Sequence, residues 1–357
     1  MKKLLVLSTA LTSVAFVAQA DVTVMSWGGG YTTSQIEAYH KPFTAATGTA
    51  VISVDSDNPA PQVKTMVEAG NVTVDVADVE YADAIRLCDE GMLEPIGMDA
   101  LPAGADGTPA ADDFLPGAVT DCAVATIVFS TVFAYDASKF AGEKPSTIAD
   151  LFDTAKFPGK RALGKRAKAN LEMALMADGV PAADVYATLE TPEGVDRAFA
   201  KLDTIKADTI WWEAGAQPPQ LLADGEVAMT TAYNGRIFGA AVTDGKPFVT
   251  VWDGQVFEYD LFVIPKGAPN KDAALEFVKF ATSTQALADQ AKWISYGPAR
   301  KSSAALVGLF NDGKTEMAPY MPTAPANMTN ALASSYEFWV DRDAELNERF
   351  NAWLAAN

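Results

Sequence analysis

Aromatic residues stand next to acidic residues at four places where short β-like segments of the chain end. A primary ammonium group needs carboxylates for charge and hydrogen bonds. Aromatic faces can hold its methylenes and add cation–π attraction of about 0.5–2 kcal/mol each. The four groups are Trp27 with Tyr31; Asp78, Glu80 and Tyr81; Trp211, Trp212 and Glu213; and Glu258, Tyr259 and Asp260. Their recurrence at strand ends predicts a binding site for a small amine.

Each of these residues also has a purely structural interpretation. Trp211 and Trp212 alternate along one expected strand, so one of the two is expected in the core. Tyr259 could pack against the sheet, and Asp78 could cap the helix that follows it. Taken singly, each residue therefore stays open between a structural role and a ligand-binding role.

The residues needed for most catalytic centres are missing from the sequence. His40 is the single histidine, which excludes a histidine-based triad and a multi-histidine zinc site, and we expect it on a helix surface. Cys88 and Cys122 lack the spacing of a redox or metal motif. Gly28–Gly30 matches no phosphate-binding loop, so we interpret these glycines as a place where a ligand approaches the backbone. We expect no cofactor and no bound metal.

Alternating β-like and helical segments predict an α/β fold that positions the four groups. In the first part of the chain, strands are expected at 22–27, 51–54 and 74–79, and helices at 32–46, 62–69 and 81–90. This alternation is typical of a parallel sheet, in which ligands bind at the carboxyl ends of the strands. The loops that begin at Trp27, Asp55 and Asp78 are therefore the expected walls of the site in this part of the chain.

The α/β alternation continues after a long apolar run at 123–135, which suits a buried strand or one that crosses between lobes. Further helices are expected at 147–152, 170–177, 195–205, 218–224, 273–282, 284–292 and 341–355, and further strands at 208–212, 227–232, 248–252 and 257–264. No repeat and no low-complexity linker separates two domains in series. We therefore expect two lobes that exchange chain more than once.

The N-terminus carries the features of a secretion signal. Lys2 and Lys3 are followed by an uncharged, mostly apolar stretch at 4–17 and by Ala18-Gln19-Ala20, an A-x-A cleavage pattern. A membrane anchor is the alternative, but the apolar run is shorter than the ~20 residues of a membrane span. We expect cleavage after Ala20, a soluble mature chain that begins at Asp21, and a periplasmic location.

Length, charge and cysteine content narrow the class of protein further. The 357 residues exceed one ordinary domain and predict two. A net charge of −19, from 46 acidic and 27 basic residues, argues against nucleic acid and anionic lipid as partners. In an oxidising compartment Cys88 and Cys122 are expected to form a disulfide, with two buried free thiols as the alternative.

Several short motifs lie along the chain in a characteristic order. They are the strand that ends in Trp27, Glu90-Gly91-Met92-Leu93-Glu94-Pro95-Ile96, Asn234-Gly235, Asp260 with Val263-Ile264-Pro265-Lys266, Asn270-Lys271-Asp272-Ala273-Ala274, and Tyr296-Gly297-Pro298. In their order and spacing the chain resembles the spermidine/putrescine-binding periplasmic proteins of bacterial ABC importers, within the type II extracellular solute-binding proteins. The resemblance implies a receptor, not an enzyme, that binds an amine between two lobes, closes on it and is read by an inner-membrane ABC permease.

The resemblance also implies the architecture of the molecule. It predicts a two-lobed periplasmic-binding-protein (type II) α/β fold, in which each lobe is a mainly parallel sheet flanked by helices and the lobes are hinged at crossover strands. The expected ranges are 21–131 and 257–298 for lobe 1, and 132–256 and 299–357, with the C-terminal helices, for lobe 2. We expect a monomer.

Matched positions imply specific contacts and a first hypothesis for the ligand. Asp260 falls on an acid that holds an ammonium, and Trp27 and Tyr233 fall on cleft aromatics, with Glu80 and Tyr81 on a loop that closes one end of the site. The first hypothesis is a receptor for a putrescine-like or spermidine-like polyamine. In it, Asp260 anchors the ammonium and Trp211 completes an aromatic box with the two cleft aromatics.

One stretch departs from this pattern and supports a second hypothesis. The polyamine binders commonly carry acids where this chain reads Lys165-Arg166-Ala167-Lys168-Ala169-Asn170, and Arg236 follows Asn234-Gly235. Either these basic residues face solvent, or they favour a shorter diamine or a zwitterion. The second hypothesis is the same receptor role for an ω-amino acid held by Asp260 and Arg236.

A third hypothesis is a secreted hydrolase with paired carboxylates. Glu213 with Asp260, or Asp78 with Glu80, could perform acid–base work. Turnover of a substrate without closure of the lobes would favour this hypothesis.

Overall fold

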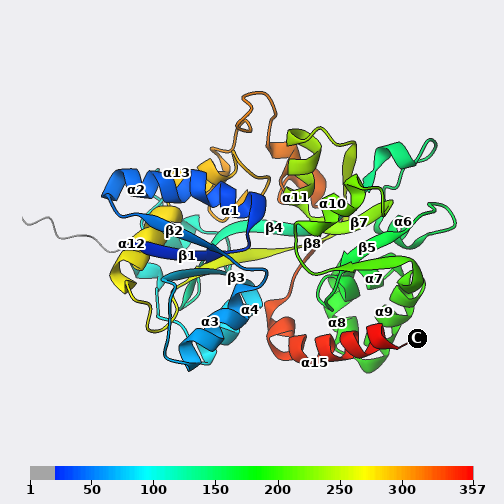
Figure 1. Ribbon diagram of the computed structural model, residues 1–357, viewed down its shortest axis with the longest axis horizontal. Helices are drawn as coiled ribbons and strands as arrows, with labels where there is room; N and C mark the ends of the chain where they lie inside the picture. The colour runs from blue at the N-terminus through cyan, green and yellow to red at the C-terminus, as the bar shows by residue number, and fades with distance from the viewer. Residues whose placement is uncertain (1–20, 357) are drawn as a thin grey trace, which may run out of the picture.

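The computed structural model describes residues 21–356, and a single mixed sheet runs through this part of the chain (Figure 1). The predicted secretion signal at 1–20 lies outside the described residues. The 10-stranded sheet of the described residues has the order β2-β1-β3-β8-β4-β7-β5-β6, with β10 beside β8 and β9 beside β4. The strands are β1 (Val22–Ser26), β2 (Val51–Asp55), β3 (Val76–Glu80), β4 (Ala123–Asp136), β5 (Arg161–Gly164), β6 (Thr209–Trp212), β7 (Met229–Tyr233), β8 (Phe248–Val263), β9 (Gly297–Pro298) and β10 (Ala331–Ala333).

Helices cover both faces of the sheet at each end of the molecule. The main helices are α1 (Gly29–Gln35), the π-helical turn η1 (Ile36–His40), α2 (Lys41–Thr47), α3 (Pro59–Glu68), α4 (Tyr81–Asp89), α6 (Ile148–Phe152), α7 (Asn170–Ala177), α8 (Val185–Leu189), α9 (Pro192–Asp203), α10 (Gln217–Ala223), α11 (Asn234–Phe238), α12 (Lys271–Ala281), α13 (Thr284–Gln290) and α15 (Tyr336–Ala355). In Figure 1, α1, α2 and α13 lie above β1–β3, and α3 and α4 lie below. At the other end α10 and α11 lie above, and α7, α8, α9 and α15 lie below.

Two long strands, β4 and β8, join the two ends of the sheet. The outer strands are parallel within each end, whereas β4 and β8 are antiparallel to each other and to their neighbours β7 and β3. The apolar run of the sequence forms β4, in which every residue is buried. Between Thr131 and Phe133 the register shifts, so that Trp252 to Gln255 of β8 stand opposite Val132 alone.

The separate strands predicted at 248–252 and 257–264 are wrong, because they form the single strand β8. Asp253 and Gly254 lie between them and are residues typical of turns. Gly254 has a φ of +73°, and a Cβ at this position would meet the side chain of Ile148 at 2.5 Å. The glycine therefore allows a local irregularity within one continuous strand and the close approach of α6 to it.

Two large hydrophobic clusters divide the molecule into two lobes. The first lobe comprises β1–β3, α1–α4, α12 and α13 around a cluster that includes Phe277. The second lobe comprises β5–β7 and α6–α11, with Leu175 and Phe350 in its main cluster. Helix α15 packs on the second lobe, but the ring of Tyr336 at its start lies 4.5 Å from that of Tyr81 on α4. The C-terminal helix therefore contacts both lobes.

His40 is buried, which corrects the prediction that it lies on a helix surface. Its side chain is 4% exposed, its ring packs against Phe277, and its Nδ1 lies 3.0 Å from the Ser53 hydroxyl. Burial lowers the pKa of His40 to about 4. The residue ends the π-helical turn between α1 and α2, and such a turn rotates the faces of a helix relative to a regular α-helical pattern.

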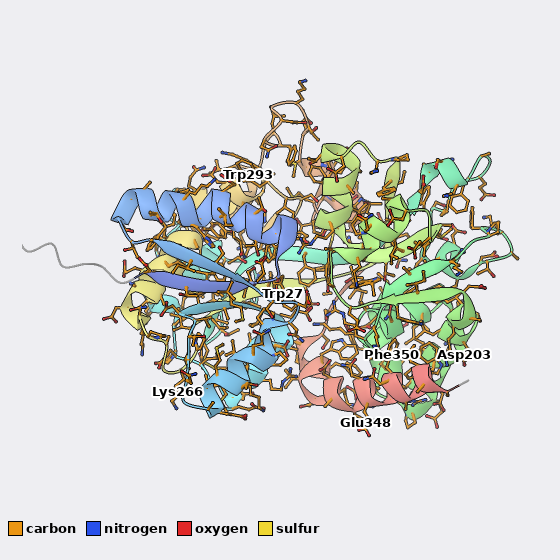
Figure 2. All side chains as sticks on the ribbon, viewed as in Figure 1. Trp27, Asp203, Lys266, Trp293, Glu348 and Phe350 are labelled. Carbon is orange, nitrogen blue, oxygen red and sulfur yellow. A yellow bond between two sulfur atoms is a disulfide. The ribbon has the colours of Figure 1, made fainter. Side chains whose placement is uncertain are left out.

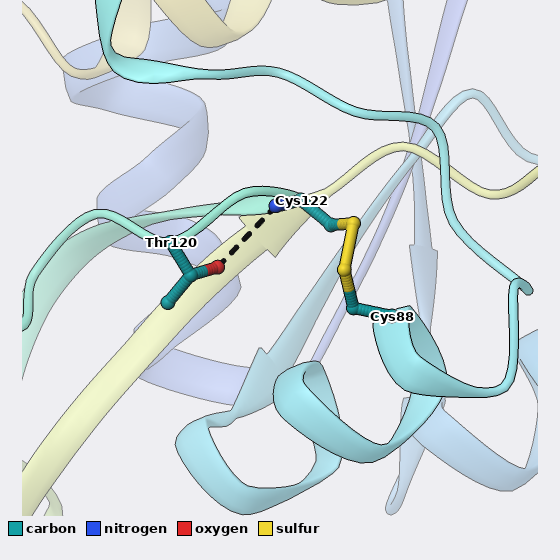
Figure 3. The surroundings of a disulfide bond; sticks show 3 residues. All are labelled: Cys88, Thr120 and Cys122. Carbon is teal, nitrogen blue, oxygen red and sulfur yellow. Dashed lines mark hydrogen bonds between the residues drawn. A yellow bond between two sulfur atoms is a disulfide. The ribbon is translucent and has the colours of Figure 1, made fainter.

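A disulfide joins Cys88, near the end of α4, to Cys122, just before β4 (Figure 3). The backbone N–H of Cys122 donates a hydrogen bond to the Thr120 hydroxyl at 3.4 Å. The disulfide closes a loop inside the first lobe, with a sequence separation of 34 residues between the two cysteines. It therefore fixes the loop that precedes the first crossover strand.

We expect the Cys88→Ala/Cys122→Ala variant to lose about 3–4 kcal/mol of unfolding free energy, because a disulfide across a loop of this length restricts the unfolded chain. Urea unfolding of the unliganded protein, followed by circular dichroism, measures the loss. Wild-type protein unfolded in the presence of a reductant serves as the control and should match the variant. Equal stability of the variant and the oxidised wild type would contradict the prediction.

Candidate ligand-binding site

A pocket lies between the two lobes and spans about 470 Å³. Seven of the predicted contact residues line it, namely Trp27, Tyr31, Glu80, Glu213, Tyr233, Arg236 and Asp260. Trp27 follows β1, and Figure 2 shows it near the middle of the molecule, where the lobes meet. Glu80 ends β3 and Tyr233 ends β7, so the site lies at the carboxyl ends of strands from both lobes.

Aromatic rings form the apolar walls of the pocket. The rings of Tyr31 and Tyr296 meet edge to face at 5.5 Å, and those of Phe129 and Tyr233 do the same at 5.5 Å. Phe129 and Tyr296 were not predicted as site residues. Phe129 lies inside the continuous apolar run of β4, which carries no signal of a binding role. Tyr296 belongs to a motif that was used only for the family resemblance. Asp57 and Gly215 also line the pocket and were not predicted.

Asp260 presents a carboxylate oxygen without a partner. The side chain is 6% exposed, and no described residue hydrogen-bonds its buried Oδ1. Burial, helped by the nearby carboxylates of Asp78 and Glu80, raises the pKa of Asp260 well above its usual range. A ligand ammonium would supply both the missing hydrogen bond and the missing positive charge.

Asp78 lies behind the pocket wall rather than in it. Its Oδ2 accepts hydrogen bonds from the Tyr31 hydroxyl at 2.8 Å and from the Gln35 amide, so Asp78 orients a residue that does line the pocket. Burial raises the pKa of Asp78 to about 7 despite these hydrogen bonds. The side chain does not cap the following helix, which was its alternative interpretation.

Arg236 brings a positive charge from α11 of the second lobe to the end of β1. Its Nη2 donates to the carbonyl oxygen of Gly28 at 2.9 Å and to that of Trp27 at 3.3 Å. Its Nε is buried and has no hydrogen-bond partner among the described residues. A Cβ at Gly29 would meet Nη1 at 2.7 Å, and Gly29 has a φ of +57°. Of the glycines predicted to let a ligand approach the backbone, Gly29 makes room for Arg236, whereas a Cβ at Gly28 would meet Asp55 at 3.3 Å.

The basic stretch before α7 enters the interface between the lobes, except for Lys165. Arg166 Nη1 lies 2.9 Å from Glu80, and Lys168 Nζ lies 2.9 Å from Glu80 and 2.5 Å from Glu258. Burial alone would raise the pKa of Glu80, but the two cations outweigh it and lower that pKa to about 2. Exposed Lys165 pairs with Glu213 at the pocket rim, at 2.7 Å.

Besides Asp78, two further predicted contacts, Trp211 and Tyr81, do not line the pocket. Trp211 packs against Phe350 and Trp353 of α15, with ring centroids 5.4 and 5.6 Å apart, so its assignment to the aromatic box is corrected. Alternation on β6 turns the neighbouring Trp212 toward Tyr233 instead, at 5.7 Å.

Tyr81 also lies outside the pocket. Its ring packs 5.8 Å from Tyr259 and 4.5 Å from Tyr336, at the contact between α4 and α15. Tyr81 therefore contributes to the packing of α4 against α15 and does not form a wall of the pocket.

Comparison with known proteins gives the family. Residues 38–323 match the family of bacterial extracellular solute-binding proteins, which covers more than half of the chain. The chain belongs to this family. Like other members, this solute-binding protein is the receptor of an ABC importer, and the family implies a periplasmic location. The predicted two-lobed α/β fold is confirmed by its structural neighbours.

Individual relatives bind small molecules, among them gamma-aminobutyric acid and glucopine. The solute-binding protein is 45% identical over 351 residues to the gamma-aminobutyric acid-binding protein of Pseudomonas aeruginosa, covering 97% of this chain and 96% of the relative. It is 36% identical to the GABA receptor Atu4243, with a TM-score of 0.79, covering 94% of this chain and 98% of that one. It is 31% identical to MotA from A. tumefaciens B6 in complex with glucopine, with a TM-score of 0.84, covering 94% and 99%.

The predicted membership in the solute-binding proteins of ABC importers is therefore confirmed. The narrower resemblance to spermidine/putrescine-binding proteins is not supported, because the relatives named here bind other ligands. The solute-binding protein captures a small molecule and delivers it to a permease, and its family and fold are those of receptors rather than of hydrolases. None of the helices within residues 21–356 combines the length and apolar character that a membrane span requires.

Proposed function

We propose that this solute-binding protein captures a short ω-amino acid of the γ-aminobutyrate class, with the ammonium on Asp260 and the carboxylate on Arg236. One observation carries the proposal: the pocket holds two buried, unpartnered polar atoms of opposite charge, Asp260 Oδ1 and Arg236 Nε. The buried indole N–H of Trp27 also lacks a partner among the described residues and is a further donor for a carboxylate. Charged ligand groups would satisfy atoms that are costly to leave unpaired.

The charges around the pocket argue against a diamine. Glu80 and Glu258 are already paired with Arg166 and Lys168. A second ammonium would therefore approach Arg236 without a free buried carboxylate to receive it, because Asp57, the other pocket acid without an ion pair among the described residues, is exposed. The polyamine hypothesis needs two acidic poles, whereas the buried lining of the pocket offers one free acid, Asp260, and one base, Arg236. The γ-aminobutyrate named for two relatives has this dipolar character.

The remaining features of the receptor complete the proposal. Tyr31, Tyr233, Phe129 and Tyr296 would hold the methylenes of the ligand, with Glu213 at the rim. The mature chain would begin at Asp21 after cleavage following Ala20 and act as a monomer. The closing bodies would be 21–131 with 257–298, and 132–256 with 299–357.

A thermal-shift panel tests the proposed ligand class. We expect γ-aminobutyrate to raise the melting temperature, because a ligand at 100 times its Kd adds about 2.7 kcal/mol of stability. Butylamine and butyrate each carry only one of the two charged groups and should shift it far less, as should putrescine and spermidine. A larger shift with putrescine or spermidine than with γ-aminobutyrate would restore the polyamine hypothesis.

A further inference from the structure

Three carboxylates converge beside the pocket. Glu80 of β3 stands opposite Asp260 of β8 in the antiparallel register, and Glu258 lies two residues away on the same face of β8. All three side chains are buried between the lobes. Because a row of buried anions is unfavourable alone, its neutralisation by cations of the second lobe decides what else can bind there.

Lys168 neutralises two of these carboxylates at once. Its ammonium nitrogen lies 2.9 Å from Glu80 Oε2 and 2.5 Å from Glu258 Oε2, with the side chain only 7% exposed. Glu80 has Arg166 as a second cationic partner, whereas Lys168 is the one cation within ion-pair distance of Glu258 among the described residues. A primary ammonium between two carboxylates is the same chemistry that a protein would use to hold the amine of a ligand.

The backbone after Lys168 is strained in a way that supports a specific role. Ala169 has a φ of +68°, the one positive φ at a residue other than glycine in the part of the chain that the structure describes. Such a conformation is unfavourable for alanine and persists only where surrounding contacts enforce it. The strained residue directly follows Lys168 and precedes α7, so it fixes the direction from which the lysine enters the acidic cluster.

We infer that Lys168 is a specificity-determining residue: it acts as a built-in second ammonium that occupies the Glu80–Glu258 carboxylates and restricts the ligand to a single amine. The inference rests on the proposed function, which it extends by assigning the rejection of diamines to one side chain. Glu80 lines both the ligand pocket and a second hollow of about 890 Å³, which Lys168 also lines. Truncation of Lys168 therefore leaves an unpaired acid and open space one side chain away from the ligand ammonium.

Calorimetry with putrescine and γ-aminobutyrate on wild type and Lys168→Ala tests the inference. We expect the ratio of the putrescine affinity to the γ-aminobutyrate affinity to rise at least tenfold in the variant, because the second ammonium of putrescine replaces the lost one. Lys168→Arg keeps the charge and should show no gain. In Lys168→Ala/Glu258→Gln the acid that would receive the ammonium is gone, so the gain should disappear.

Loss of the lysine could also unfold the protein, since it leaves Glu258 buried without a cation. In that case putrescine should restore the melting transition or the refolding yield of Lys168→Ala, while the double variant folds without it. No putrescine-dependent gain in affinity, melting temperature or refolding overturns the inference.

The proposed function fails separately from this inference. If the wild-type protein does not bind γ-aminobutyrate, the proposed ligand is wrong, even where Lys168→Ala gains putrescine binding. A wild type that binds γ-aminobutyrate, with a variant that gains nothing, removes the role of Lys168 alone.

Discussion

Arg236→Met should weaken γ-aminobutyrate binding by about 100-fold to 4,000-fold, because removal of one partner from a buried charge pair costs about 3–5 kcal/mol. In the variant the ligand carboxylate would be desolvated opposite a methionine, with no guanidinium to receive it. The variant also loses the hydrogen bonds from Nη2 to the backbone of Trp27 and Gly28, which join the two lobes beside the ligand. Isothermal titration calorimetry with γ-aminobutyrate measures the loss.

A matched control separates this effect from the loss of any arginine. Arg197 of α9 is exposed, pairs with Asp178 and does not line the pocket, so Arg197→Met should leave the affinity unchanged. Butylamine lacks the carboxylate, and its weak binding should be nearly the same in wild type and Arg236→Met. Unchanged γ-aminobutyrate affinity in Arg236→Met would remove this residue from the carboxylate site.

Asp260→Asn should weaken ligand binding at least tenfold while leaving the unliganded protein as stable as wild type, or more stable, at pH 8. A charge-assisted hydrogen bond is worth about 1.5–3 kcal/mol, and an amide cannot replace the carboxylate opposite an ammonium. The same substitution that weakens binding should preserve or raise the stability of the unliganded protein. Burial raises the folded-state pKa of Asp260 above its unfolded value, so the wild type loses stability as pH rises from the unfolded pKa through the folded one.

The measurement combines calorimetry with urea unfolding at pH 5 and pH 8. The unfolding free energy of Asp260→Asn, relative to that of wild type, should increase from pH 5 to pH 8. Because Asp260 must be ionised to bind an ammonium, the affinity of wild type should also rise with pH, and this rise should be absent in the variant. Exposed Asp341 provides the control, since Asp341→Asn should change neither quantity. A variant that is destabilised equally at both pH values, with normal affinity, would mean that Asp260 has a structural role only.

Local patterns in the sequence were sufficient for the elements that carry the site. The strand that ends before Trp27 follows from a β-like segment of the sequence. The role of Asp260, which lies inside β8, follows from the family resemblance instead. Such patterns do not show which side chains of the four-residue strand β6 face which side of the sheet. Trp211 and Trp212 are equivalent in sequence, and only the packing of distant α15 on β6 decides which one faces the pocket side. Phe129 is hidden for a related reason, because every residue of β4 is buried.

Charge partners were the least predictable part of the site. Arg166 and Lys168 lie more than 80 residues from Glu80 in sequence, and no local pattern distinguishes a lysine in solvent from one that enters an interface. The backbone strain at Ala169 is likewise invisible in the sequence, since alanine is common in helices. Long-range ion pairs of this kind depend on how two lobes meet, which is a property of the folded chain.

The register shift between β4 and β8 determines how the two lobes can move. Four residues of β8, Trp252 to Gln255, face the single residue Val132, so the ladder between the crossover strands is interrupted there while it continues on both sides. Two paired strands resist sliding, but an interrupted ladder yields to bending. We therefore expect the two lobes to open and close by bending at this interruption rather than by sliding past each other. Bending of this kind would present the two lobes to the permease in the same relative alignment at each closure.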